Sequence, residues 1–151
     1  MVDIVHRVGI KAPLHAVYQA LATREGAAGW WAVDTRGESV VGGTLKFVFT
    51  ADGKELGAFD IQVRELAPEQ RVLWEVVGGP PEWVGTRISF DLKQEDDFAV
   101  ILFKHEGWRE PGEFMSHCST KWAIFLMSLK AYVETGKGSP SPDDVKISNW
   151  H

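Results

Sequence analysis

One histidine of the sequence stands where it could take part in proton transfer. His105 and Glu106 end an apolar stretch, directly before Gly107 and Trp108. A histidine at a cavity rim could orient a polar group or act as an acid or base near neutral pH. A hydrogen-bonded structural histidine would suit the same position, and the same two readings apply to His6. The sequence keeps both roles open.

A second candidate for chemistry is the adjacent pair His117 and Cys118. Neighbouring residues on a helix do not face each other, so the pair is poorly placed to share a proton. We therefore expect Cys118 to be a small buried hydrophobe. As the only cysteine, it allows no internal disulfide and no thiolate metal cluster, which fits a reducing cytoplasm.

The remaining sequence carries no motif for catalysis or metal binding. The five histidines show no HxH or HExxH spacing, and there is no nucleophile elbow or phosphate-binding glycine loop. We therefore expect no catalytic residue, no metal and no cofactor. The histidines are His6, His15, His105, His117 and His151.

The elements that must position these residues begin with a strand and two short helices. Residues 2–11 alternate polar and apolar side chains, which predicts a strand. Pro13 suits the first turn of a helix that runs to about Ala22. Thr23 can cap a second helix, which starts at Arg24 and leads to two tryptophans.

Five further stretches show the period of two that is typical of an antiparallel sheet with one buried face. The last of them is apolar on both faces, so its register stays open. If Phe103 faces inward, His105 does too. The five stretches are centred on residues 45–49, 59–63, 72–76, 86–92 and 98–106.

A single long helix is predicted from about Gly112 to Thr135, with its apolar residues in one arc and Gly136 as its C-cap. At 1.5 Å per residue, about 23 residues span roughly 35 Å, enough to cross a sheet of six or seven strands. The chain therefore reads as one α+β domain over residues 1–136. Residues 137–151 are expected to form a loosely attached tail.

Seven tryptophans and eight phenylalanines among 151 residues could fill a core or line a cavity. We expect a ligand-sized cavity between the sheet and the long helix, and a solid core is the alternative. The residues expected to line it are Trp30, Trp31, Phe47, Phe49, Phe59, Ile61, Trp74, Val76, Ile88, Phe90, Phe103, His105, Trp108, Met115, Cys118, Trp122 and Leu126.

Trp30 and Trp31 could form a lid over the mouth of this cavity, and Trp83 is another possible mouth residue. Because neighbours on a helix cannot both point inward, the other reading is that one ring is packed inside and the other is half exposed.

The sequence contains Val8-x-Ile10-x-Ala12-Pro13-x-x-x-Val17-x-x-Ala20-Leu21, then Trp30-Trp31, then the strands, and Trp122 in the long helix. The order and spacing of these features resemble the SRPBCC (START-like) superfamily, over roughly residues 2–136. Within it, the chain is most similar to proteins related to the C-terminal domain of the activator of the heat-shock chaperone ATPase. The resemblance implies a helix-grip fold, a curved sheet wrapped around the last helix.

From these features we expect a non-catalytic module that binds a small apolar or amphipathic molecule, lipid-like or polyaromatic. A cyclase, dehydratase or hydrolase that uses His105, and a chaperone-associated interaction domain, remain alternatives. The net charge of −5 argues against nucleic acid, and no apolar run is long enough for membrane insertion. We expect a cytoplasmic protein. Ile124, Met127 and Trp150 could form a surface for a homodimer.

Overall fold

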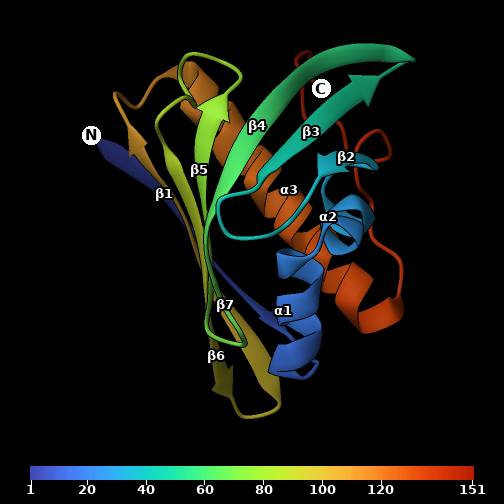
Figure 1. Ribbon diagram of the computed structural model, residues 1–151. Helices are drawn as coiled ribbons and strands as arrows, with labels where there is room; N and C mark the ends of the chain where they lie inside the picture. Colours follow the sequence, from blue (N-terminus) through green and yellow to red (C-terminus); the bar gives the residue numbers. More distant parts are fainter.

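The computed structural model describes residues 1–151, which form seven strands and three helices (Figure 1). In chain order, these are β1 (Val2–Ile10), α1 (Leu14–Ala22), α2 (Arg24–Trp30), β2 (Asp34–Gly37), β3 (Thr44–Ala51), β4 (Lys54–Ala67), β5 (Arg71–Gly78), β6 (Arg87–Glu95), β7 (Phe98–Trp108) and α3 (Glu113–Thr135). No helix is both long and apolar enough to cross a bilayer.

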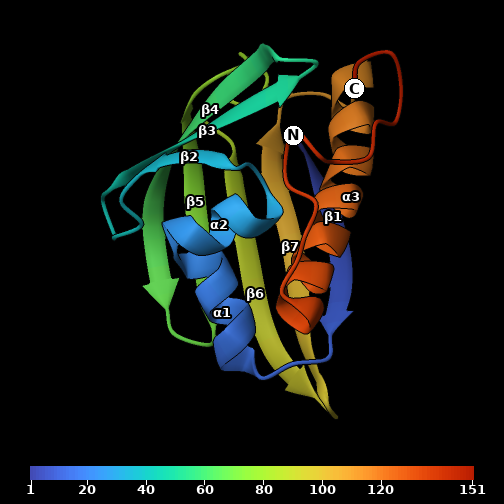
Figure 2. The same cartoon turned by 90° about the vertical axis from the view of Figure 1, so that its right-hand side faces the viewer.

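All seven strands belong to one antiparallel sheet, in the order β1-β7-β6-β5-β4-β3-β2. The register of the ladder shifts at β-bulges or irregularities, one in the β1–β7 pair, one in the β3–β4 pair and two in the β4–β5 pair. A bulge bends its strand and increases the local twist, so the sheet curves (Figure 2). The seventh strand, β2, is an addition to the six stretches read from the sequence. Its four residues carry no alternating pattern.

The predicted helices are confirmed. Thr23 caps α2 by accepting a hydrogen bond from the Gly26 amide at 3.0 Å, and Gly136 ends α3 with a left-handed φ of 86°. All three helices lie on the same side of the sheet, with α3 across its concave face (Figures 1 and 2). The architecture is the α+β helix-grip arrangement that the sequence predicted.

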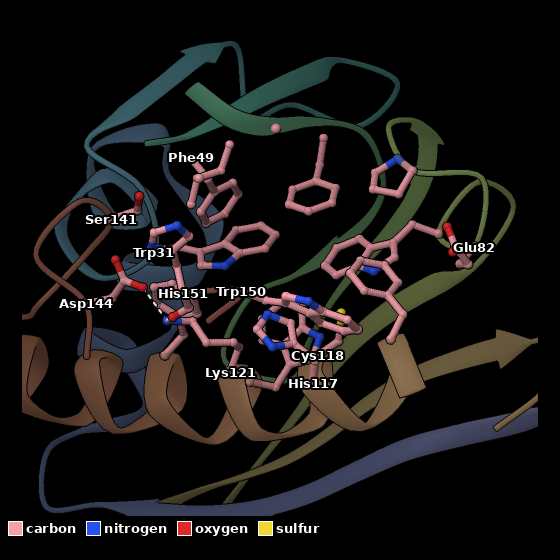
Figure 3. Close-up of a pocket in the computed structure, with 18 residues that line it drawn as sticks. Trp31, Phe49, Glu82, His117, Cys118, Lys121, Ser141, Asp144, Trp150 and His151 are labelled. Carbon is pink, nitrogen blue, oxygen red and sulfur yellow. Dashed lines mark hydrogen bonds and ion pairs between the residues drawn. The ribbon is translucent and has the colours of Figure 1, made fainter. Parts of the chain in front are cut away.

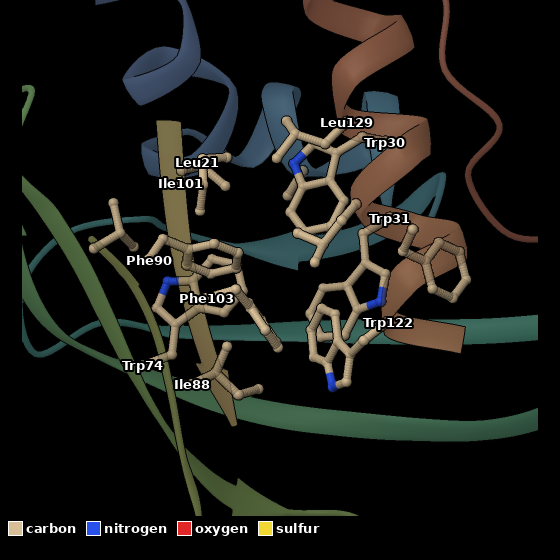
Figure 4. Close-up of a cluster of buried hydrophobic side chains, with 14 of the residues drawn as sticks. Leu21, Trp30, Trp31, Trp74, Ile88, Phe90, Ile101, Phe103, Trp122 and Leu129 are labelled. Atoms are coloured by element: carbon tan, nitrogen blue, oxygen red, sulfur yellow. The ribbon is translucent and has the colours of Figure 1, made fainter. Parts of the chain in front are cut away.

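The core between sheet and helices consists largely of aromatic rings (Figure 4). Trp30 and Trp31 are both buried, at 0% and 2% exposure, so the expectation that one ring would stay half exposed is wrong. The physical reason is that α2 ends at Trp30. Trp31 is the C-cap of α2 and keeps αR backbone angles, and its ring packs past the helix end toward the sheet, where its centroid lies 5.8 Å from that of Trp74.

The C-terminal tail is attached more closely than its sequence suggested. Ser141 is 2% exposed and forms an isolated bridge with Ala32. Its amide donates to the Trp31 carbonyl at 2.8 Å, and the Val33 amide donates to the Ser141 carbonyl at 3.1 Å. The expectation of a loosely attached tail is therefore wrong. The tail sequence alone does not show this attachment, because the hydrogen-bond partners are distant in the sequence.

Candidate functional site

A cavity of about 450 Å³ lies at one end of the interval between the sheet and α3 (Figure 3). Its walls come from the β3–β4 hairpin, the β5–β6 loop, the first half of α3 and the tail. Such a volume falls within the ~300–1,000 Å³ that is usual for small-molecule sites. The lining residues are Trp31, Phe49, Leu56, Gly57, Phe59, Pro80, Glu82, Trp83, Phe114, His117, Cys118, Lys121, Trp122, Phe125, Ser141, Asp144, Trp150 and His151.

Polar groups concentrate where the tail meets α3. The Lys121 ammonium forms an ion pair with Asp144, whose side chain is only 7% exposed. It also donates to the carbonyl oxygens of Val145 at 2.8 Å and His151 at 3.2 Å. The imidazole of His117 packs edge-to-face against Trp150, with their centroids 5.5 Å apart. Lys121 thus fastens the tail as one wall of the cavity.

The structure brings only part of the expected site to this cavity. Five of the expected residues line it: Trp31, Phe49, Phe59, Cys118 and Trp122. The others pack elsewhere, beneath or beside it, and all of them except the partly buried Met115 are buried: Trp30, Phe47, Ile61, Trp74, Val76, Ile88, Phe90, Phe103, His105, Trp108 and Leu126.

His105 faces inward as Phe103 does, and its hydrogen bonds fix its protonation state. The Trp122 indole N–H, which can only donate, lies 3.0 Å from His105 Nδ1. Nδ1 must therefore be unprotonated, and Nε2 carries the proton that is donated to Thr86 Oγ1 at 2.8 Å. The Thr86 hydroxyl in turn donates to the Trp83 carbonyl at 2.6 Å. Each polar side-chain atom in this series of hydrogen bonds has a partner within the protein. His105 therefore has the role of a hydrogen-bonded structural histidine.

Burial lowers the pKa of His105 from 6.5 to about 3, because a charged imidazolium would lose its hydration. The residue is fully buried and lies outside the cavity lining. A neutral histidine with both nitrogens engaged is poorly suited to acid or base chemistry near pH 7.

Cys118 is the one thiol of the cavity wall, and burial raises its pKa from 9.0 to about 12, with a smaller opposing contribution from the Trp83 indole N–H. Since the thiolate is the reactive form, we expect alkylation of native protein at pH 8 to be roughly a thousandfold slower than that of an unfolded control. Iodoacetamide labelling followed by intact mass would measure this. Equal rates with and without urea would contradict it.

Sequence reasoning missed the residues that reach the cavity from loops and from the tail. Leu56, Gly57 and Glu82 lie in or near turns, and Asp144 and His151 belong to the tail. Two signals were present: Trp83 was recognised as a possible mouth residue, and Trp150 is a large ring in an otherwise polar segment. Neither signal shows which face of the fold the tail follows.

A curved antiparallel sheet that holds a long C-terminal helix, with an aromatic cavity between them, defines a START-like, helix-grip domain of the SRPBCC type. Residues 11–134 match the family model described as activator of Hsp90 ATPase homolog 1-like protein. The chain belongs to this family. A search of curated proteins finds no significant match.

Solved structures agree with this assignment. The chain is 45% identical to the protein of the Aha1 dimer from Colwellia psychrerythraea, with a TM-score of 0.79 over 91% of this chain and 100% of that one. SSP2350 from Staphylococcus saprophyticus shares the fold at 16% identity, with a TM-score of 0.74 over 93% and 97% of the two chains. DynU16, from the dynemicin biosynthetic locus, is 24% identical, with a TM-score of 0.72 over 91% of this chain and 49% of DynU16.

Proposed function

We propose that this domain binds, without catalysis, a flat apolar or amphipathic molecule in the cavity beside α3. The observation that carries the proposal is a cavity of about 450 Å³ whose 18 lining residues include eight tryptophans and phenylalanines. Burial of the ligand's apolar surface, at ~25 cal/mol per Å², would supply the driving force. We place this activity in the cytoplasm.

The orientation of the lining rings favours a planar ligand. The rings of Trp31 and Phe59 are inclined by 3°, those of Phe59 and Trp83 by 18°, and those of Trp83 and Trp122 by 18°. The rings of Trp31 and Trp122 are inclined by 28°. These four rings form a stack of similar orientation in the cavity wall, which a polycyclic aromatic molecule could extend. A flexible alkyl chain would gain the same burial but no stacking.

A polar group on the ligand would find a donor in the cavity wall. Trp83 is 4% exposed, and its indole N–H has no oxygen or nitrogen acceptor. The neighbour of this N–H is the Cys118 sulfur, which is a weak acceptor, and a ligand carbonyl or hydroxyl oxygen would be a stronger one. Glu82 lies at the end of the cavity opposite to Asp144 and the tail (Figure 3).

Native mass spectrometry of freshly purified protein, followed by solvent extraction, tests the proposal. We expect either a co-purified small molecule or saturable binding from a panel of polyaromatics, sterols and fatty acids, with polyaromatics binding most tightly. Quenching of fluorescence from the cavity tryptophans would report the same event. Empty protein that ignores the whole panel would overturn the proposal.

Gly57→Phe should block the cavity without disturbing the fold. A Cβ atom added at Gly57 meets no atom within 4 Å, and Gly57 is not among the glycines that require a positive φ. The ring would therefore occupy ligand space, and we expect affinity for the best panel ligand to fall at least ~tenfold, since filling an apolar site removes the burial that drives binding.

The matched control is Val77→Phe, which adds a ring on the outward face of β5, where Val77 is 43% exposed. It should bind as the unaltered protein does. Titration of both variants by fluorescence or calorimetry, with thermal unfolding as a check of folding, makes the comparison. Unchanged affinity in folded Gly57→Phe would place the ligand elsewhere.

The two alternative functions have weaker support. An enzyme that uses His105 would need that residue in the cavity and able to take up a proton, and the hydrogen bonds of its ring oppose this. A chaperone-associated role follows from the family relation alone, and a reproducible pull-down of an Hsp90-type chaperone would support it.

We also propose that the chain forms a homodimer. The support is its 45% identity with the Colwellia psychrerythraea protein, which is described as a dimer. Light scattering over a concentration series would show twice the mass of 16.8 kDa. A constant single mass would contradict the proposal.

A further inference from the structure

The tail after α3 has a first part that is fixed to the domain. The Ser139 amide donates to Ser128 Oγ at 2.7 Å, and Ser141 is 2% exposed. The side chain of Asp144 is only 7% exposed. Residues 139–144 therefore follow a course that is set by buried contacts.

Residues 145–151, which we call the lid segment, are held differently. Val145 and Trp150 are 58% and 44% exposed. The hydrogen bonds that join the lid segment to residues outside the tail all come from the Lys121 ammonium, which donates to the carbonyl oxygens of Val145 at 2.8 Å and His151 at 3.2 Å. The other hydrogen bonds of the lid segment stay within the tail. Segments with few buried contacts open at a low cost in free energy, so we expect this part of the tail to move.

The lid segment covers one side of the cavity. Trp150 and His151 both line it (Figure 3). The Trp150 ring packs edge-to-face against His117 of α3, with the centroids 5.5 Å apart. Movement of the lid segment away from α3 would take both side chains out of the wall and widen the cavity mouth.

The other walls are held more firmly. Strands β3 and β4 are joined by a ladder that continues to their turn. The β5–β6 loop is tied by Arg109, whose guanidinium donates to the Pro81 carbonyl at 2.9 Å, and by the Gly85 amide, which donates to the Val76 carbonyl at 2.9 Å. The lid segment is therefore the wall that opens with the least disruption of the fold.

We propose that the lid segment moves away from α3 to admit and release the ligand, and that Lys121 is its latch. This inference describes how the proposed binding site opens, and it rests on that function. Opening breaks the two bonds from Lys121 to carbonyl oxygens and the contact between Trp150 and His117. Because the lid segment is largely exposed, water can replace the hydrogen bonds that are lost.

Asp144 fixes the start of the lid segment. Its carboxylate pairs with Lys121 and, at 3.2 Å, with Lys146. Breaking a buried ion pair would leave an uncompensated charge, which is strongly destabilising. The pair between Lys121 and Asp144 therefore stays formed while the lid segment moves, and it keeps the ammonium in place for closure.

Trp150→Ala tests whether the lid segment controls entry. We expect 1-hydroxypyrene, a planar probe with one hydroxyl group, to associate and dissociate at least ~fivefold faster in the variant, because loss of the ring contact with His117 raises the open fraction of the lid segment. A ring that formed only part of a fixed wall would change the dissociation rate alone. Stopped-flow fluorescence measures both rates.

Lys121→Met tests the latch without a ligand. Methionine cannot donate a hydrogen bond, and Asp144 keeps Lys146 as its partner. We expect hydrogen exchange at the hydrogen-bonded amides of the lid segment to become at least ~tenfold faster, since bonds from a charged donor are lost. Mass spectrometry of peptides after exchange measures this.

Lys130→Met is the matched control, on the same helix. The Lys130 ammonium also donates to a backbone carbonyl, that of Gly9, but it lies outside the cavity lining. Its removal should leave exchange in the lid segment unchanged. The amides of Ser139 and Ser141 should keep their rates in both variants.

The outcomes separate this inference from the binding proposal. If 1-hydroxypyrene binds but Trp150→Ala leaves its association rate unchanged, the lid is wrong although the ligand site stands. The same holds if exchange in Lys121→Met equals that in Lys130→Met. If neither 1-hydroxypyrene nor the rest of the panel binds, the binding proposal fails and the lid has no ligand to admit, whatever the exchange rates show.

Discussion

Replacing Trp31 by alanine is expected to lower the free energy of unfolding by about 3–5 kcal/mol, the range for loss of a large buried ring. Trp31 is 2% exposed and lies where core and cavity meet. Its removal would leave a void that the curved sheet cannot close. The rings around it, with centroids between 4.3 and 6.4 Å away, are Trp30, Phe47, Phe49, Phe59, Trp74 and Trp122.

Trp150→Ala is the matched control, because it removes the same side chain from a position that is 44% exposed. We expect it to change the free energy of unfolding by no more than ~1 kcal/mol. Urea unfolding of both variants, followed by circular dichroism, gives the comparison. If Trp31→Ala costs no more than the control, Trp31 does not hold the helix and the sheet together.

Acidification from pH 6.5 is expected to destabilise the protein through His105. Its pKa is about 3 in the folded state and 6.5 when unfolded, so the unfolded state binds the proton first. The contribution of His105 is therefore complete above pH 6.5 and is lost as the pH falls toward 3. At 1.36 kcal/mol per pH unit, the loss reaches ~3 kcal/mol by pH 4.5.

His105→Asn isolates this contribution, because asparagine does not titrate and keeps an acceptor for the Trp122 indole. The variant should be less stable at pH 7, yet its stability should change less steeply between pH 6.5 and 4.5. Urea unfolding at several pH values measures the slope. An unchanged slope would assign the acid sensitivity to other groups.

Much of the fold could be read from local pattern. The alternation of apolar and polar residues predicted five strands after β1. The change to a helical period near Gly112 predicted α3 with its glycine cap. The strand β2 was missed, because it is a short edge strand that pairs with β3 without burying an alternating face. The inward direction of His105 followed from that of Phe103, but its partners Thr86 and Trp122 did not.

The cavity was predicted less well than the fold. The sequence indicated aromatic residues on one face of the sheet and on α3, and five of the expected residues do line a cavity. It did not indicate that rings such as Trp74 and Phe90 fill the centre of the interval, so that the aromatic cavity lies at one end. Whether facing side chains meet or leave a void depends on volumes summed over several elements.

The sequence by itself determined every element except β2, together with their order and apolar faces, because these follow from side-chain periodicity and from capping residues a few positions apart. The tertiary structure decided the position of Trp31, the course of the tail along Lys121 and Ser141, and the site of the cavity. These features depend on contacts between residues up to about a hundred positions apart, such as Trp31 with Ser141. No local pattern encodes such contacts, because packing selects them only after the sheet has curved and α3 has crossed it.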